Sequence, residues 1–176
     1  FFAEDYKGNI QDIFENKVLS KDLSFYVRNA SVTDTTLAPA GHSSVYVLVP
    51  VPNRQSEIDW DNEKNTFRDR VVKALIERAK MSDLEAHIRE EIIFTPQTWQ
   101  DMNIQFGATF SLAHSFTQML HFRPRNKFEE LDNCYLVGGG THPGSGLPTI
   151  YESGRIAANL ISKEHGILFE SKNQQV

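Results

Sequence analysis

The chain has 176 residues, of which 40% are hydrophobic and 23% are charged, and its formal net charge is -5 at pH 7. This length and composition are typical of a globular chain that buries a core in one or two compact units. The negative charge argues against a nucleic-acid-binding surface, since such surfaces need a basic patch. The longest cationic cluster contains only Arg123, Arg125 and Lys127.

Two further features of the whole chain limit its class. Cys134 is the one cysteine and has no partner for an internal disulfide, so we expect it to pack as a small buried hydrophobe in a reducing compartment. We find no signal-peptide pattern, and no apolar run approaches the roughly 20 residues that cross a bilayer. The chain begins with Phe1 and not with methionine, which we interpret as a piece of a longer protein.

The first 50 residues predict one helix and two strands. Apolar residues at helical spacing over residues 2–15 predict an amphipathic helix. Its expected buried stripe is Phe2, Tyr6, Ile10, Ile13 and Phe14. Residues 25–27 are a strand candidate, and a turn-rich linker follows over 29–42. The run 45–49 is the clearest strand, and its nearly continuous apolarity suggests burial on both faces.

The middle of the chain is mainly helical by its periodicity. Residues 65–89 predict two helices or one bent helix, with a break near 81–83, where Ser82 or Asp83 can cap the second helix. Residues 92–94 are a short strand candidate. Thr95 and Pro96 resemble a helix N-cap followed by proline at the first helical position. The segment 106–122 is rich in Phe, Leu and Met, and its secondary structure is ambiguous.

The C-terminal part predicts a strand over 134–137, a glycine loop over 138–146 and a helix over 148–163 that stops near Gly166. Glycine lets backbone N–H groups approach a ligand, and the start of a helix favours negative charge. A nucleotide cofactor is therefore the first candidate ligand, and a structural turn without a ligand is the alternative. The glycine spacing does not match G-x-G-x-x-G, so the loop is not the primary ADP-binding turn.

Residues 135–148, YLVGGGTHPGSGLP, resemble the C-terminal flavin motif of the phytoene desaturases, which are carotenoid-forming members of the amine-oxidase-like FAD enzymes. Other segments resemble the same family, its fungal branch most of all. These segments are 24–27, 31–34, 37–39, 41–42, 46–52, 95–99 and 122–124. The resemblance therefore covers nearly the whole chain.

The resemblance implies an α/β fold class, namely the C-terminal portion of a two-domain FAD-binding flavoprotein (Rossmann-like, amine-oxidase type) with part of its mixed-sheet substrate domain. Residues 1–130 would belong to the substrate-binding region, 131–166 would return to the FAD-binding domain, and 167–176 would form a tail. Family members begin with a βαβ unit that carries G-x-G-x-x-G and an acidic residue for the ribose, and this sequence contains neither. We therefore expect an incomplete FAD site.

The same resemblance implies which residues contact the flavin. They are Gly138, Gly139, Gly140, Thr141, His142, Pro143, Gly144, Gly146, Leu147, Pro148 and Thr149. The N–H groups of Gly146, Leu147 and Thr149 can stabilise negative charge at the flavin pyrimidine edge. Pro148 has no N–H and is expected to set the first helical turn.

The catalytic residue stays unknown at this point. His142 is a weak candidate for a general base because an imidazole titrates near neutrality, but a polar residue in a glycine loop more often orders that loop. Arg123 is expected to form a surface ion pair with Glu129 or Asp132, or to lie near a cofactor phosphate. We expect no metal site.

The candidates for a hydrophobic substrate channel are Phe106, Phe110 and Phe116, together with Trp99. The alternative for the three phenylalanines is core packing. For Trp99 the alternative is a buried anchor of a short helix.

The activity implied by the resemblance is FAD-dependent desaturation of phytoene, a C40 polyene, toward lycopene or more desaturated carotenes. We expect an intracellular protein that contacts a membrane surface peripherally. Oxygen, a quinone and NAD all remain candidates for the terminal electron acceptor, and the oligomeric state is open. Two alternatives are a carotenoid isomerase or retinol saturase-like flavoprotein, and a non-enzymatic nucleotide-binding module.

Overall fold

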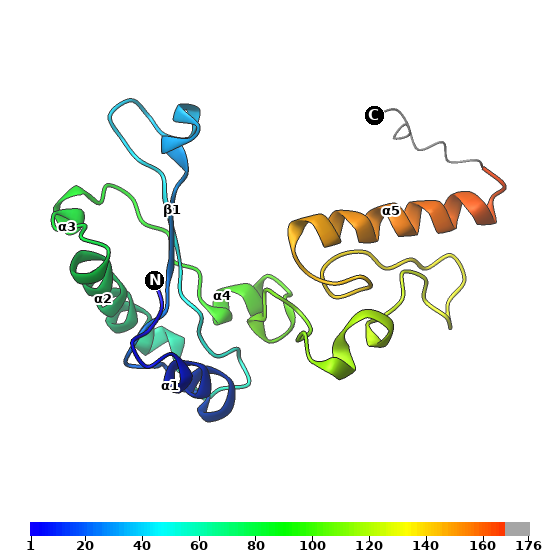
Figure 1. The fold of residues 1–176 in the computed structure, drawn as a ribbon, viewed down its shortest axis with the longest axis horizontal. Helices are drawn as coiled ribbons and strands as arrows, with labels where there is room; N and C mark the ends of the chain where they lie inside the picture. Colours follow the sequence, from blue (N-terminus) through cyan, green and yellow to red (C-terminus); the bar gives the residue numbers. More distant parts are fainter. Residues whose placement is uncertain (168–176) are drawn as a thin grey trace. The chain divides into compact units, whose positions relative to one another are not determined.

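A computed structural model describes residues 1–167, which fall into two compact units, Phe1–Ala108 and the described part of Thr109–Val176 (Figure 1). The mixture of helix and strand agrees with the expected class at this coarse level. Within residues 1–167 the sheet consists of two antiparallel strands. The expected division into 1–130 and 131–166 refers to a complete flavoprotein and stays a prediction, and most of the expected tail lies outside the described residues.

The first unit contains both strands and most helices. Its elements are α1 (Tyr6–Gln11), which continues as a π-helical turn (Asp12–Asn16), β1 (Tyr26–Asn29), β2 (Val45–Leu48), α2 (Trp60–Arg78), α3 (Leu84–His87) and α4 (Pro96–Asp101). Short 3-10 turns lie at Ala30–Val32, Thr35–Leu37 and Gln105–Gly107. The second unit has 3-10 turns at Phe116–Gln118 and Leu120–Phe122, followed by α5 (Leu147–Glu164). No helix in the described part of the chain has the length and apolarity needed to span a bilayer.

The core of the first unit forms where α2 packs against the hairpin and the segment before it. Its buried residues are Leu23, Phe25, Trp60, Phe67 and Leu75, and Val27 and Val47 of the paired strands pack against them. The Trp60 and Phe67 rings meet edge to face at 6.0 Å between centroids. Burial of these large side chains supplies the main favourable free energy for this unit.

Several helix signals of the sequence are confirmed. The helix break near residues 81–83 separates α2 from α3, α5 ends two residues before Gly166, and Thr95 caps α4 through a reciprocal contact with Thr98. The helix α2 begins five residues earlier than expected. It does so because the Asp59 carboxylate accepts hydrogen bonds from two N–H groups of the first turn.

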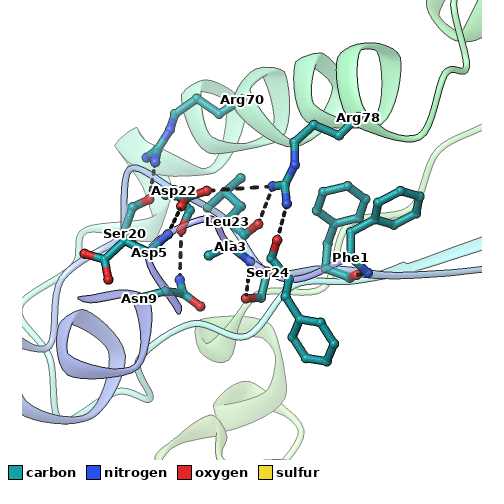
Figure 2. A network of polar contacts seen from close by, with 12 residues as sticks. Phe1, Ala3, Asp5, Asn9, Ser20, Asp22, Leu23, Ser24, Arg70 and Arg78 are labelled. Atoms are coloured by element: carbon teal, nitrogen blue, oxygen red, sulfur yellow. Dashed lines mark hydrogen bonds and ion pairs between the residues drawn. The ribbon is translucent and has the colours of Figure 1, made fainter. Parts of the chain in front are cut away.

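Two arginines of α2 hold the N-terminal segment through its backbone (Figure 2). The Arg78 guanidinium donates to the carbonyls of Leu23, at 2.5 Å, and Phe2. It also lies 3.8 Å from an oxygen of Asp22. The Arg70 guanidinium donates to the Ser20 carbonyl. The segment is thus attached to α2 by charge-assisted hydrogen bonds, which do not require its side chains to be apolar.

This attachment explains why the expected N-terminal stripe is wrong. Ile13 is buried, but Phe2, Tyr6 and Phe14 are exposed, and Ile10 is at the edge of exposure. The buried residue of α1 is Asn9, whose amide donates to the Asp22 carbonyl at 2.9 Å. The helix is also shorter than predicted, because only Tyr6–Gln11 is α-helical.

Three strand predictions need correction. Residues 92–94 and 134–137 form no strand, and the latter contribute only an isolated bridge between Tyr135 and Lys127. Strand β2 is present, but Val45 and Tyr46 at its start are exposed, so burial on both faces is wrong there. Apolar and β-branched residues favour a strand only where a partner strand lies beside them. Cys134 is half-buried and not enclosed in a core.

Candidate functional site

The glycine loop, residues 138–146, leads directly into α5 as expected. Gly144 and Gly146 have φ angles of +148° and +103°, in a region that residues with a side chain rarely adopt. A Cβ atom on Gly140 would lie 2.8 Å from the Ser111 hydroxyl oxygen. Backbone geometry alone therefore favours glycine at positions 144 and 146, whether or not the loop binds a ligand.

The start of α5 exposes backbone donors. Gly146 occupies the N-cap position, where it offers no side chain to the first turn, and Pro148 lies in that first turn as predicted. Within residues 1–167 we find no acceptor for the N–H groups of Gly146, Leu147 and Thr149. Such a donor set suits a ligand with acceptor atoms and partial negative charge. The pyrimidine edge of a flavin has this chemistry, so the residues present fit the expected cofactor.

One small polar side chain, that of Ser153, fixes the loop to α5, and a second, that of Thr141, makes a hydrogen bond within the loop. The buried Ser153 hydroxyl accepts a hydrogen bond from the Gly138 N–H at 2.8 Å and donates to the Ile150 carbonyl at 2.6 Å. The Thr141 hydroxyl donates to the Gly138 carbonyl at 3.0 Å. Because Ser153 and Ala157 are small and buried, the loop backbone can approach the helix closely.

The buried side chain of Asn126 supports the loop through hydrogen bonds. Its buried amide nitrogen donates to the carbonyls of Leu136 at 3.1 Å and His142 at 3.0 Å. Longer contacts of 3.4 Å reach the Ser153 carbonyl and the Thr141 hydroxyl. Nothing in the sequence marks Asn126 for this role, because an asparagine between charged residues has the pattern of a surface position.

Arg123 is also buried, and the prediction that it forms a surface ion pair is wrong. The residue is 2% exposed and donates only to backbone carbonyls, including that of Gly139 at 2.8 Å. The ion pair in this segment belongs to Arg125, which contacts Glu129 at 2.6 Å on the surface. A cluster of charges in the sequence does not reveal which of its members the chain buries.

His142, the weak catalytic candidate, has one ring nitrogen engaged. Its Nδ1 lies 3.2 Å from the Leu120 carbonyl oxygen, and its backbone N–H donates to the Pro124 carbonyl at 2.8 Å. A carbonyl can only accept, so this contact requires the proton on Nδ1 and leaves Nε2 as the acceptor of the neutral ring. The half-buried Pro143 follows it.

The His142 side chain lines a cavity of about 580 Å³, which the N-terminal residues of α5 do not line. Charged residues of both signs surround this cavity, including Arg125, Lys127, Glu129 and Asp132. The structure therefore places His142 beside a cavity that both charged and apolar residues line. No contact between its ring and the free N–H groups of α5 is present in the described part of the chain.

The four channel candidates belong to both units. In the first unit, the half-buried Trp99 of α4 stacks on Phe94 with 4.8 Å between centroids, and Phe106 is exposed at a left-handed backbone position with φ +53°. Phe110 and Phe116 belong to the second unit and are exposed. Core packing is therefore wrong for the three phenylalanines within this chain, and the channel stays a prediction.

No protein-family model matches the chain. Individual relatives do, and the chain spans about a third of the length of those it matches. It is 59% identical over 170 residues to a 4,4'-diapophytoene desaturase (4,4'-diapolycopene-forming) of Methylomonas sp, a match that covers 96% of this chain and 33% of the relative.

Two further relatives carry related names. A phytoene desaturase (neurosporene-forming) of Rhodobacter capsulatus is 43% identical over 159 residues, with 89% of this chain and 30% of the relative covered. A phytoene desaturase of Neurospora crassa is 40% identical over 169 residues, with 93% and 28% covered. The expected preference for the fungal branch is therefore wrong, since the Methylomonas protein is the more similar. Over nearly its whole length, this chain is similar to about a third of each of these three carotenoid desaturases.

Proposed function

We propose that the protein containing this chain is an FAD-dependent carotenoid desaturase that introduces carbon–carbon double bonds into phytoene or a similar linear polyene. The observation that carries the proposal is the 59% identity over 170 residues to a desaturase of this substrate class. The glycine loop and the free donors at the start of α5 support FAD as the cofactor, because they suit its acceptor-rich edge.

Each desaturation removes a hydride from one carbon and a proton from its neighbour. Bound FAD would supply the two-electron acceptor, and oxygen, a quinone or a nicotinamide would then have to reoxidise it. In this chain, Nε2 of His142 is the candidate to accept the proton, because Nδ1 is held by the Leu120 carbonyl. The N–H groups of Gly146, Leu147 and Thr149 would bind and orient the cofactor edge.

The substrate 4,4'-diapophytoene is the second candidate. The Methylomonas relative is named for it, and the two phytoene desaturases reported above have lower identity to this chain. Both substrates are apolar polyenes. The exposed Phe110 and Phe116, with Phe106 and Trp99, are our candidates for the wall of the channel that admits them.

The site would be shared with parts of the protein outside this chain. In this proposal, residues 1–130 belong to the substrate region of a two-domain, Rossmann-like flavoprotein, and residues 131–166 return to its FAD-binding domain. Because an apolar polyene partitions into lipid, we propose peripheral, intracellular attachment to a membrane. The exposed aromatic side chain of Phe122 suits such a contact.

The test uses the full-length protein with FAD and liposomes that contain either phytoene or 4,4'-diapophytoene. New visible absorption bands, and products lighter by two hydrogens for each step, are the expected result. The substrate that reacts faster decides between the two candidates. An isomerase would change double-bond geometry at constant mass, and a nucleotide-binding module would bind FAD and leave the polyene unchanged. Either result would contradict the proposal.

A further inference from the structure

The Arg123 side chain is a buried cation that contacts backbone carbonyls alone. Its Nε and Nη2 donate to the Gly139 carbonyl at 3.2 and 2.8 Å, and Nη2 also reaches the Leu112 carbonyl at 3.1 Å. Its Nη1 donates to the carbonyls of Gln118 and Ala113 at 2.7 and 3.3 Å. Among residues 1–167, no carboxylate lies within ion-pair distance of this guanidinium.

Burying a charge without a counter-charge is costly unless hydrogen bonds replace its hydration. The planar fork of arginine provides that replacement here, because two of its nitrogens converge on one oxygen, that of Gly139. Lysine has the same charge but donates from a single nitrogen. This position therefore depends on the shape of the guanidinium and not only on its charge.

The contact with Gly139 has a consequence for the next residue. In a trans peptide the carbonyl of one residue and the N–H of the next point in opposite directions. Since the Gly139 carbonyl points to Arg123, the Gly140 N–H points away from it. The described residues offer no acceptor to this N–H group.

We infer that Arg123 is a positioning residue for the cofactor loop. By fixing the peptide between Gly139 and Gly140, the guanidinium presents the Gly140 N–H as a preformed donor to an acceptor atom of the flavin. The inference rests on the proposed function, because it assumes that the loop binds FAD. Arg123 acts through the loop backbone and does not itself need to touch the cofactor or the substrate.

The first test compares three variants of the full-length protein by FAD titration, followed through quenching of flavin fluorescence. Arg123→Lys and Arg123→Met should both raise the Kd for FAD by about tenfold or more, the equivalent of about 1.4 kcal/mol. Arg125→Met is the matched control, because Arg125 lies two residues away and its ion pair is on the surface. It should change the Kd by less than about twofold. Equal affinity in all four proteins would overturn the inference.

The second test needs no variant and remains decisive if those at Arg123 do not fold. Amide exchange of the wild-type protein is measured by NMR with 15N-labelled glycine, with and without FAD. The Gly140 amide should be protected by FAD, whereas Gly154, inside α5, should not change. Bound FAD without protection of Gly140 would overturn the inference and leave the proposed function intact. Failure of the wild-type protein to bind FAD would contradict both.

Discussion

Asn126 makes several hydrogen bonds that hold the second unit together. Its amide nitrogen donates to two carbonyls within 3.1 Å, those of Leu136 and His142, and it is buried. Asn126→Asp keeps the size of the side chain but replaces the donor with a carboxylate that faces these carbonyls. We expect a loss of about 2–4 kcal/mol of stability, because buried acceptors lose their partner and a charge is buried.

Thermal unfolding of the variant and the wild-type protein at pH 7 measures this effect. Asn65→Asp is the control, because this substitution makes the same chemical change at an exposed position of α2. A melting temperature for Asn126→Asp equal to that of the control variant would mean that this amide does not hold the loop.

Single residues differ in how much of their role the sequence reveals. The loop glycines were predictable, because the positive φ angle that Gly144 and Gly146 adopt is a local property that favours glycine. Arg123 and Asn126 were not. Their partners are carbonyls 16 residues away in sequence, Gly139 and His142, and every residue carries a carbonyl, so no side-chain pattern marks the pairing.

One polar cluster attaches the end of α5 to the segment before the loop. The Glu164 carboxylate accepts from the Lys127 ammonium at 2.7 Å and from the Tyr135 hydroxyl at 2.5 Å. The hydrogen bond from Lys127, and then that from Tyr135, lowers the pKa of Glu164 below its usual 4.5. The bond to Glu164 raises the pKa values of Lys127 and Tyr135 above their usual 10.5 and 10.0.

These directions fix the pH range in which the cluster stabilises the fold. A lowered carboxyl pKa adds stability above the unfolded value of 4.5, which is lost as the pH falls through the folded value. The raised pKa values of Lys127 and Tyr135 add stability below 10, which is lost as the pH rises. Melting temperatures across this range should therefore show a wild-type advantage over Glu164→Gln at neutral pH that disappears in acid.

Tyr135→Phe separates the loss of stability in acid from the loss at high pH. It removes the phenol that titrates at high pH but keeps the Lys127–Glu164 pair. The loss of stability in acid should therefore persist, but be smaller than in the wild-type protein. If Glu164→Gln and the wild-type protein had equal melting temperatures at every pH from acid to neutral, the cluster would have no role in stability. We expect small effects, since all these groups are solvent-accessible.

The start of α5 allows a prediction about a single backbone donor. Leu147 is the first residue of the helix, its side chain is exposed, and its N–H has no acceptor within the described range 1–167. Leu147→Pro removes this N–H together with the leucine side chain, at a position where helices accept proline. In the full-length protein it should weaken FAD binding about tenfold, since one hydrogen bond to a polar ligand is lost.

Leu147→Ala is the matched control, because it shortens the side chain and keeps the N–H. Its FAD affinity should stay close to that of the wild-type protein in the same fluorescence titration, and circular dichroism should report equal helix content for both variants. Similar affinities for the proline and alanine variants would show that the flavin does not use this donor.

Helices were easier to predict than strands, and for a physical reason. The caps of α2 and α4, Asp59 and Thr95, act on N–H groups within three residues of themselves, so the signal is contained in a short window of sequence. A strand needs a partner from elsewhere in the chain. Residues 92–94 and 134–137 have the composition of strands but no such partner in the part of the chain that the structure describes.

We predict that this chain alone retains little FAD. It spans about a third of its relatives and contains no G-x-G-x-x-G motif for the ADP moiety. The absorbance ratio at 450 and 280 nm after gel filtration compares it with the full-length protein purified in the same way. A stoichiometric yellow flavin in the isolated chain would show that the loop and α5 are sufficient for binding.

The family resemblance was predictable from one motif, whereas the arrangement of the helices and strands was not. Residues 135–148 have an unusual composition, and the relatives confirm the resemblance that they indicated. The core between α2 and the hairpin depends on pairing of β1 with β2, which lie 15 residues apart and have no tight-turn signal between them. The hydrophobic pattern located these strands but did not specify their antiparallel register.

The buried guanidinium of Arg123 also bears on how the second unit loses its structure. One side chain satisfies carbonyls in two segments, residues 112–118 and Gly139, so neither segment can detach without exposing the other to an unpaired buried charge. The two segments should therefore open together as one cooperative unit. Their amides should share a common opening free energy in native-state exchange, although residues 112–118 contain little regular structure.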